Sequence, residues 1–271
     1  MTIRKASVAG QFYLAEPTAL RAAVDGYITA AALEPVPDRV AAMVVPHAGH
    51  IYSGACAGHA FARARGKRPK RIVILGRSHY AHFERASVYT HGGFETPLGV
   101  MPIDEPLATA LSAECASSPP DPHLMEHAIE VLLPFLQVNF GNVPIIPVLF
   151  GSDPGPWHVR IGEILASMLG ESDLVVASTD LSHFLDEEHA NRLDQASLSQ
   201  VLRKHCGSLS EGIASGRCSM CGGTAVVVAM AYALARDARS WKLLDYRTSA
   251  AVTGDYSRVV GYGSISMEWE I

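Results

Sequence analysis

Three short apolar segments, far apart in the chain, each end in a loop that carries a histidine. The segments are 41–45, 71–76 and 173–178, and each has the length and composition of a strand buried on both faces. Segments of helical composition lie between them. Strands that alternate with helices favour a three-layer α/β sandwich, with helices on both faces of a largely parallel or mixed central sheet.

The loops after these strands hold residue types that often carry out chemistry. His47 follows the first strand after Pro46, which ends the strand because proline cannot donate to a sheet ladder. His79 follows the second strand, and Asp180 and His183 follow the third. Open α/β sheets bind ligands beyond the carboxyl ends of their strands. If the three strands are parallel neighbours, we expect these four side chains to converge on one cleft.

Cys221 joins this group because it opens an apolar helix that runs to about residue 234. Imidazole nitrogen, carboxylate oxygen and thiolate sulfur are all ligands of transition metals. The candidates are distant in sequence, so no zinc-finger-like spacing supports a metal, and histidines satisfied in turns or in the core are the alternative. Cys218 and Cys221 form a C-x-x-C that suits redox chemistry or half a zinc site, but one functional thiol with an incidental neighbour is the better interpretation.

A predicted helix over 126–140 carries a second polar group near its start. Glu130 lies four residues after Glu126 and three after His127, so the three side chains can share one face. They could support ligand histidines or supply an acid–base pair. The residues alone favour a plainer interpretation, which is an exposed polar helix face.

Composition narrows the class of protein. A chain of 271 residues with 48% hydrophobic residues can bury a large core, so we expect a single globular domain over 1–271. A net charge of −5 without a basic block argues against nucleic acid as a partner. No apolar run approaches the roughly 20 residues of a membrane span, and no signal-peptide pattern appears. Five cysteines do not suggest a disulfide framework, so we expect a cytoplasmic protein.

The remaining secondary structure is less regular. The segment 91–99 contains three glycines and a proline, and we expect a loop there. Two apolar segments, 241–248 and 259–267, are predicted to be strands that pair antiparallel.

Six motifs, in order along the chain, resemble those of the Memo family, whose prokaryotic members are also called AmmeMemoRadiSam system protein B. They are 46–54 (PHAGHIYSG), 75–79 (LGRSH), 126–136 (EHAIEVLLPFL), 178–183 (STDLSH), 221–223 (CGG) and 260–264 (VGYGS). The opening 8–13 (VAGQFY) also matches the start of the family. The resemblance therefore covers essentially the whole chain.

The resemblance implies a fold like that of class III extradiol dioxygenases, the LigB-like enzymes. Those enzymes bind non-haem Fe(II) through two histidines and a glutamate, and in the Memo family a cysteine replaces the glutamate. Carried over, the metal positions are His47, His79 and Cys221. The implied cofactor is iron or copper, with zinc as a third candidate.

The resemblance also suggests how the surrounding pocket is built. Animal members of the family are described as binding phosphotyrosine peptides and as supporting copper-dependent redox chemistry, and they carry a tryptophan where this chain has Phe12. The expected pocket residues for a small molecule or peptide are Phe12, Tyr52, Glu126 and Glu130. The expected acid–base residues are His127, Asp180 and His183.

This sequence departs from the family pattern at the pocket wall. Arg77 stands where a small residue or proline is usual, and the arginine often found two places after the cysteine is absent, since Gly223 is there. Substrate or peptide specificity is therefore not carried over.

Three hypotheses follow. The first is a Memo-family metal protein with redox activity on an unknown substrate. The second is a true extradiol dioxygenase in which Asp180 or Glu126 supplies the carboxylate. The third is a non-catalytic module that binds a peptide or a partner protein in the old active-site cleft. Radical-SAM and AMMECR-type proteins are the expected partners, because their genes tend to lie beside prokaryotic genes of the family.

Overall fold

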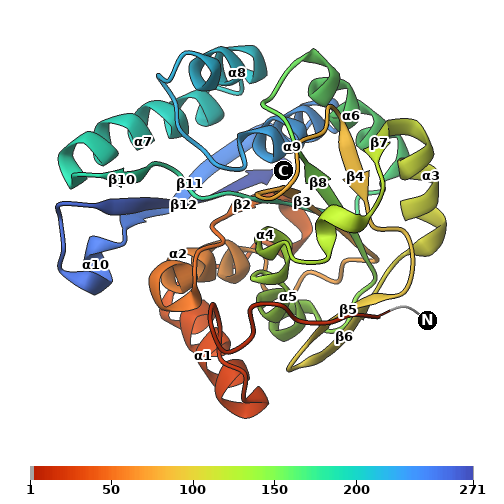
Figure 1. The fold of residues 1–271 in the computed structure, drawn as a ribbon, viewed down its shortest axis with the longest axis horizontal. Coiled ribbons are helices and arrows are strands. Elements are labelled where there is room, and N and C mark those ends of the chain that lie inside the picture. Colours follow the sequence, from red (N-terminus) through yellow and green to blue (C-terminus); the bar gives the residue numbers. More distant parts are fainter. Residues whose placement is uncertain (1–2, 271) are drawn as a thin grey trace.

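A computed structural model describes residues 3–270, and its middle layer is one large mixed sheet (Figure 1). The strands of this sheet are β2 (Val40–Val45), β3 (Ile72–Arg77), β4 (Ala86–Val88), β7 (Ala116–Ser118), β8 (Ile145–Phe150), β9 (Leu174–Ser178), β10 (His183–Leu185), β11 (Ser240–Thr248) and β12 (Val259–Glu268). Within the described residues the strand order is β10-β12-β2-β9-β3-β8-β4-β7, and β11 pairs with β12 outside that path.

The four central strands are parallel, and three of them are the predicted strands that end in histidine-bearing loops. The strand β9 lies between β2 and β3 and runs parallel to both, and β8 runs parallel to β3 on the far side. Every residue of β2, β8 and β9 is buried, which explains their continuous apolar sequences. The outer strands β12 and β4 are antiparallel to this core, and the predicted antiparallel pairing of β11 with β12 is confirmed.

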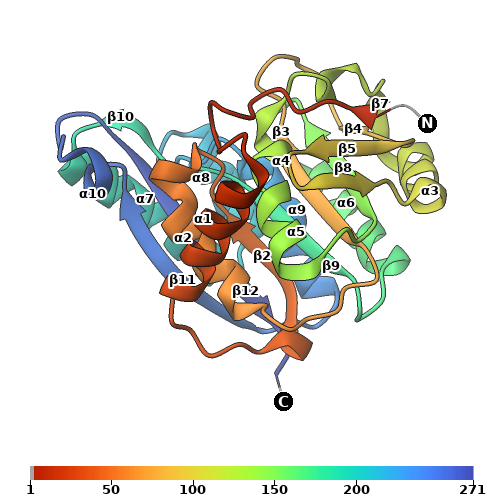
Figure 2. The same cartoon turned by 90° about the horizontal axis from the view of Figure 1, so that it is seen from below.

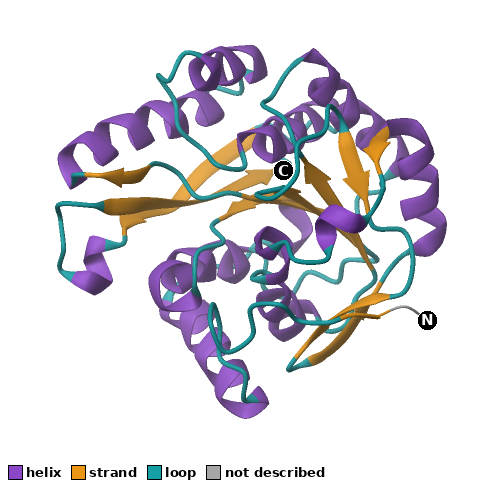
Figure 3. Cartoon of the chain, in the orientation of Figure 1, coloured by secondary structure: helices purple, strands orange, loops and turns teal. Residues whose placement is uncertain are grey.

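Helices cover both faces of the sheet, so the predicted three-layer α/β architecture is confirmed (Figure 3). The helices are α1 (Pro17–Ala30), α2 (His50–Arg63), α3 (Glu105–Cys115), α4 (His127–Glu130), α5 (Leu133–Phe140), α6 (Pro156–Met168), α7 (Glu187–Leu202), α8 (Cys206–Ala214), α9 (Gly223–Ala235) and α10 (Ala250–Thr253). The helices α1, α2, α4 and α5 lie on one face, and Figure 2 shows them in front of the sheet. The helices α6 to α9 lie on the other face.

The apolar helix α9 is the central element of that second face. All its residues from Gly223 to Ala233 are buried, and it packs against β3, β9 and α6. Within residues 3–270, no helix combines the length and the hydropathy needed to cross a membrane.

Two sequence predictions about local structure are wrong. The predicted helix over 126–140 is two helices, because Pro134 lacks an N–H donor and the chain starts a new helix, α5, with this proline in its first turn. The predicted loop over 91–99 belongs to a hairpin of β5 (Gly93–Thr96) and β6 (Gly99–Pro102). Gly99, with φ +118°, makes the turn possible. This hairpin and β1 (Ile3–Arg4) form a small second sheet.

The turn after β2 is short. His50 and Tyr52 lie on α2, which begins at His50 with Gly49 as its N-cap. The chain thus passes from strand to helix within four residues. His47 lies in the turn itself, whereas His50 and Tyr52 belong to the helix.

Candidate metal centre

The strand order places the candidate ligands next to one another. His47 lies two residues beyond the end of β2, and His79 lies two residues beyond the end of β3. Between those strands, β9 ends at Ser178. Cys221 reaches the same edge from the loop before α9, where its backbone N–H donates to the Asp180 carbonyl at 3.1 Å. The predicted convergence therefore holds for His47, His79, Asp180 and Cys221.

The two imidazoles and the thiol form one compact group. One ligand atom from each of His47, His79 and Cys221 lies within 4.8 Å of the other two. The Cys221 Sγ is 3.4 Å from His47 Nε2. An imidazole nitrogen and a thiolate sulfur bound to the same tetrahedral ion would be about 3.5 Å apart. The donor set therefore fits a transition metal ion in both chemistry and spacing.

The other nitrogen of each imidazole is held by a hydrogen-bond partner. Ser178 Oγ donates to the Ala128 carbonyl at 2.5 Å, so it can only accept from His47 Nδ1, which is 2.8 Å away. The Glu126 carboxylate accepts from His79 Nδ1 at 2.8 Å. Both Nδ1 atoms therefore carry a proton, so Nε2 is the atom of each ring that can bind an ion, once the proton on Nε2 has left. This is how proteins fix the tautomer of metal-binding histidines.

The Glu126 carboxylate is buried, and its hydrogen bonds hold the His79 loop in place. It also accepts from the backbone N–H of His79 at 2.6 Å and of Ala128 at 2.9 Å. Burial would raise its pKa, but the hydrogen bond and positive charge of His79 outweigh burial and lower the pKa to about 2. Glu126 therefore stays ionised and orients His79.

The Cys221 thiol is converted to a thiolate by its surroundings. Burial raises its pKa, but the charge of His47 and hydrogen bonds from both histidines lower the pKa to about 6. The backbone N–H of Asp180 donates to Sγ at 3.2 Å and adds to the effect. The same pairing raises the pKa of His47 to about 9, against burial, which lowers it. Metal binding would replace these protons, so it should release them to solvent.

Asp180 and Gly222 hold the loops in place. The Asp180 Oδ1 accepts from the backbone N–H of His47 at 2.8 Å and of Ala48 at 3.3 Å, so this carboxylate ties the His47 loop to the Asp180 loop. A Cβ at Gly222 would lie 2.1 Å from the Ser178 carbonyl oxygen, so only glycine lets the Cys221 loop approach β9 this closely.

His127 lies beside the three ligands. Its ring stacks on His79 at a centroid distance of 4.5 Å and lies 5.6 Å from His47. Burial, followed by the positive charge of His47, lowers the pKa of His127 to about 4, so the ring is neutral. Phe12 packs against it at 5.0 Å. His127 also belongs to a second possible ligand group with His79 and Glu126.

Glu130 does not line a pocket, and the expectation of an exposed polar helix face is also wrong. The carboxylate is completely buried and ion-pairs with Arg4 at 2.5 Å. It also accepts from the backbone N–H groups of Ser7 and Val8 and from the Tyr13 hydroxyl. Glu130 thus fastens the N-terminal segment 4–13 to α4.

The segment 4–13 in turn carries Phe12 to the site. The Phe12 carbonyl accepts from His50 N–H at 2.7 Å, which fixes the segment against the start of α2. Sequence reasoning missed this anchoring role, because the segment has no periodicity and Arg4 is 126 residues from its partner.

Two expected site residues lie away from the cluster. His183 is an exposed residue of the edge strand β10, and within residues 3–270 no hydrogen bond or ring contact joins it to His47, His79 or Cys221. The chain turns outward there because β10 pairs with β12.

Tyr52 is 41% exposed on α2, and within residues 3–270 it makes no hydrogen bond with the cluster. Cys218 is buried, and its thiol is free, as is that of Cys221.

The fold and the site together define an α/β protein with a histidine–cysteine ligand cluster at the carboxyl edge of its parallel strands. The profile described as "Memo-like protein" matches residues 4–266. The chain belongs to this family.

Curated relatives match over nearly their whole length. A MEMO1 family protein from Desulfurococcus amylolyticus is 34% identical over 98% of this chain and 99% of its own. MEMO1 family proteins from Methanopyrus kandleri and Aquifex aeolicus are each 33% identical over 97% of this chain and 98% of their own. Among solved structures, an uncharacterised protein from Escherichia coli K12 aligns with a TM-score of 0.46 and 14% identity, over 74% of this chain and 86% of its own.

Proposed function

We propose that the protein is a redox-active metal protein in which His47, His79 and Cys221 hold iron or copper, with zinc as a third candidate. The observation that carries the proposal is the pair of fixed tautomers. Ser178 and Glu126 hold the Nδ1 protons, and this leaves Nε2 of each ring as the ligand atom beside the thiolate, available to an ion when its own proton leaves.

The thiolate favours soft or borderline ions. Sulfur selects Cu(I), Zn(II) or sulfur-ligated iron, whereas a carboxylate in its place would favour harder ions. Iron or copper held here would supply one-electron chemistry toward a substrate whose identity is unknown.

The neighbouring residues have roles of their own in this proposal. The neutral imidazole of His127 can accept a proton from a molecule bound beside His79. Phe12 packs against one side of the His127 ring. Asp180 fixes the His47 loop and is a positioning residue, because its carboxylate already accepts two backbone hydrogen bonds.

The geometry supports a cysteine ligand better than the extradiol alternative. That alternative needs Asp180 or Glu126 as the third ligand, but both carboxylates accept backbone N–H donors, and Glu126 also holds His79. Binding of a peptide or of radical-SAM or AMMECR-type partners stays a prediction.

Metal content tests the proposal. Wild type, Cys221→Ser and the control Cys206→Ser are purified side by side without oxygen and analysed for iron, copper and zinc. Cys206 lies on α8 and takes no part in the cluster. We expect about one ion per chain in wild type and control, and loss of the ion in Cys221→Ser. A wild type without metal, or a Cys221→Ser variant that keeps it, would overturn the proposal.

A further inference from the structure

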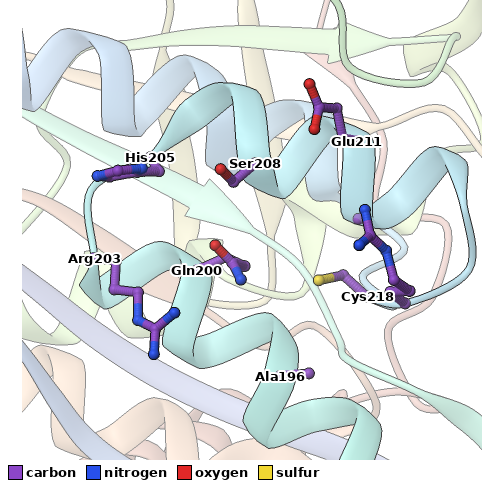
Figure 4. A pocket seen from close by; sticks show the side chains of 9 residues that line it. Ala196, Gln200, Arg203, His205, Ser208, Glu211 and Cys218 are labelled. Carbon is purple, nitrogen blue, oxygen red and sulfur yellow. The ribbon is translucent and has the colours of Figure 1, made fainter.

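A cavity lies between α7, α8 and the loop that leads to Cys221. Its volume is about 460 Å³, which is within the range of small-molecule sites. Figure 4 shows its wall, which includes Gln200 and Arg203 near the end of α7, His205 and Ser208 at the start of α8, and Cys218 on the loop. None of the residues that line it belongs to the His47, His79 and Cys221 cluster.

Two arginines give the cavity a local positive charge. Arg203 and Arg217 both line it, and within residues 3–270 neither forms a salt bridge. The Arg217 side chain makes one hydrogen bond there, from Nε to Ser215 Oγ at 2.9 Å, which leaves the rest of the guanidinium free. The chain has a net charge of −5, so this pair differs in sign from the protein as a whole. Guanidinium groups bind phosphate and carboxylate through two parallel hydrogen bonds.

The interior of the cavity offers neutral polar groups. Ser208, Gln200 and Cys218 all line the cavity, and Figure 4 shows Gln200 between the other two. Cys218 is only 5% exposed, and its sulfur has no hydrogen-bond partner among the described residues. Gly212 makes room for it, because a Cβ there would lie 2.5 Å from the Cys218 Sγ.

The start of α8 and Glu211 complete the surroundings of the cavity. His205 is the N-cap and its side chain accepts no hydrogen bond from the helix, so the first backbone N–H groups of α8 are not capped by a side chain. Glu211 is a carboxylate on the same wall, and it can accept from a hydroxyl or amino group of a ligand.

We propose that this cavity binds a small molecule that carries a phosphate or carboxylate group. Arg203 and Arg217 bind the anionic group, and Gln200 and Ser208 hydrogen-bond the rest of the ligand. None of the lining residues is a candidate metal ligand, so ligand binding and metal content are measured separately.

Calorimetric titration of the full-length protein with inorganic phosphate and with succinate tests the proposal, at constant ionic strength with chloride as the background. We expect saturable binding of at least one anion to wild type. The double variant Arg203→Gln/Arg217→Gln should bind that anion at least tenfold more weakly. The matched control is Arg21→Gln/Arg160→Gln, which removes two exposed arginines from α1 and α6 and should bind like wild type.

Gln200→Glu gives an independent check, because it keeps the side-chain size and adds a negative charge inside the cavity. It should weaken binding as much as the arginine variant does. Binding of phosphate alone or succinate alone assigns the ligand class. No saturable binding to wild type, or equal binding to wild type and both cavity variants, would refute the site, and neither result would bear on metal content.

Discussion

Replacement of Glu130 by glutamine should release the N-terminal segment that carries Phe12. The carboxylate accepts hydrogen bonds from Arg4, from the backbone of Ser7 and Val8, and from Tyr13, and water does not reach it. Glutamine keeps the shape, but it removes the charge and turns one acceptor into a donor that faces other donors. Arg4 would then be a buried charge without its ion partner.

The expected cost follows from that unpaired charge. Breaking a buried ion pair by removing one partner costs about 3–5 kcal/mol. Arg4 still donates to the carbonyls of His123 and Glu126, so we place the loss for Glu130→Gln at about 3 kcal/mol, near the lower end of that range. Urea unfolding measures this loss as a lower transition midpoint with an unchanged slope.

The matched control is Glu95→Gln, because Glu95 pairs with Lys5 of the same N-terminal segment but on the surface. It should change stability by no more than about 0.5 kcal/mol. If the segment detaches locally instead of unfolding the chain, the Ser7 and Val8 amides of Glu130→Gln should exchange with solvent about 100-fold faster, since 3 kcal/mol corresponds to roughly two powers of ten. A stability loss equal to that of the control, with unchanged exchange at Ser7 and Val8, would refute the anchoring role.

Three further predictions concern pH, the orientation of His47 and the role of His183. Burial opposes ionisation of Glu130, but the charge of Arg4 and the hydrogen bonds from Ser7 outweigh burial and lower the pKa of Glu130. The contribution of Glu130 to the free energy of unfolding is therefore present above the unfolded-state pKa of about 4.3 and lost as the pH falls further. Stability should thus fall less steeply with acid in Glu130→Gln than in wild type, as acid titration of unfolding can measure. Ser178→Ala removes the acceptor for His47 Nδ1 and should weaken metal affinity about 10- to 100-fold in competition with a chelator, whereas unchanged affinity would contradict the tautomer argument. His183→Ala should leave metal content unchanged, because His183 lies exposed on β10, and loss of the ion would place it at the site after all.

The sequence was sufficient to predict which side chains meet when they follow the ends of neighbouring strands. Buried apolar segments followed by His47, His79 and Asp180 require only that β2, β3 and β9 be parallel neighbours, and the sheet is built that way. The same reasoning failed for His183. The third loop leads directly into the edge strand β10, where the chain pairs with β12 and turns the imidazole to solvent.

The sequence was not sufficient where the partners are distant and the contact is polar. Helical spacing shows that Glu126, His127 and Glu130 share a face, but it cannot show that the face is covered by residues 4–13. Ser178 and Gly222 carried no separate signal, because a serine at a strand end and a glycine before a helix are common. Ser178 acts through its hydrogen bond with His47, and Gly222 acts through its close approach to β9. Both contacts join segments that are distant in sequence.

X-ray absorption spectroscopy, recorded at the absorption edge of the bound metal, tests most directly the claim that His47, His79 and Cys221 bind the ion. The protein is purified without oxygen, and the spectrum of wild type is compared with that of Cys221→Ser. We predict one sulfur ligand at about 2.3 Å and nitrogen ligands at about 2.0 Å in wild type, with the sulfur absent in the variant. A wild-type spectrum with only nitrogen and oxygen ligands would contradict a site formed by His47, His79 and Cys221.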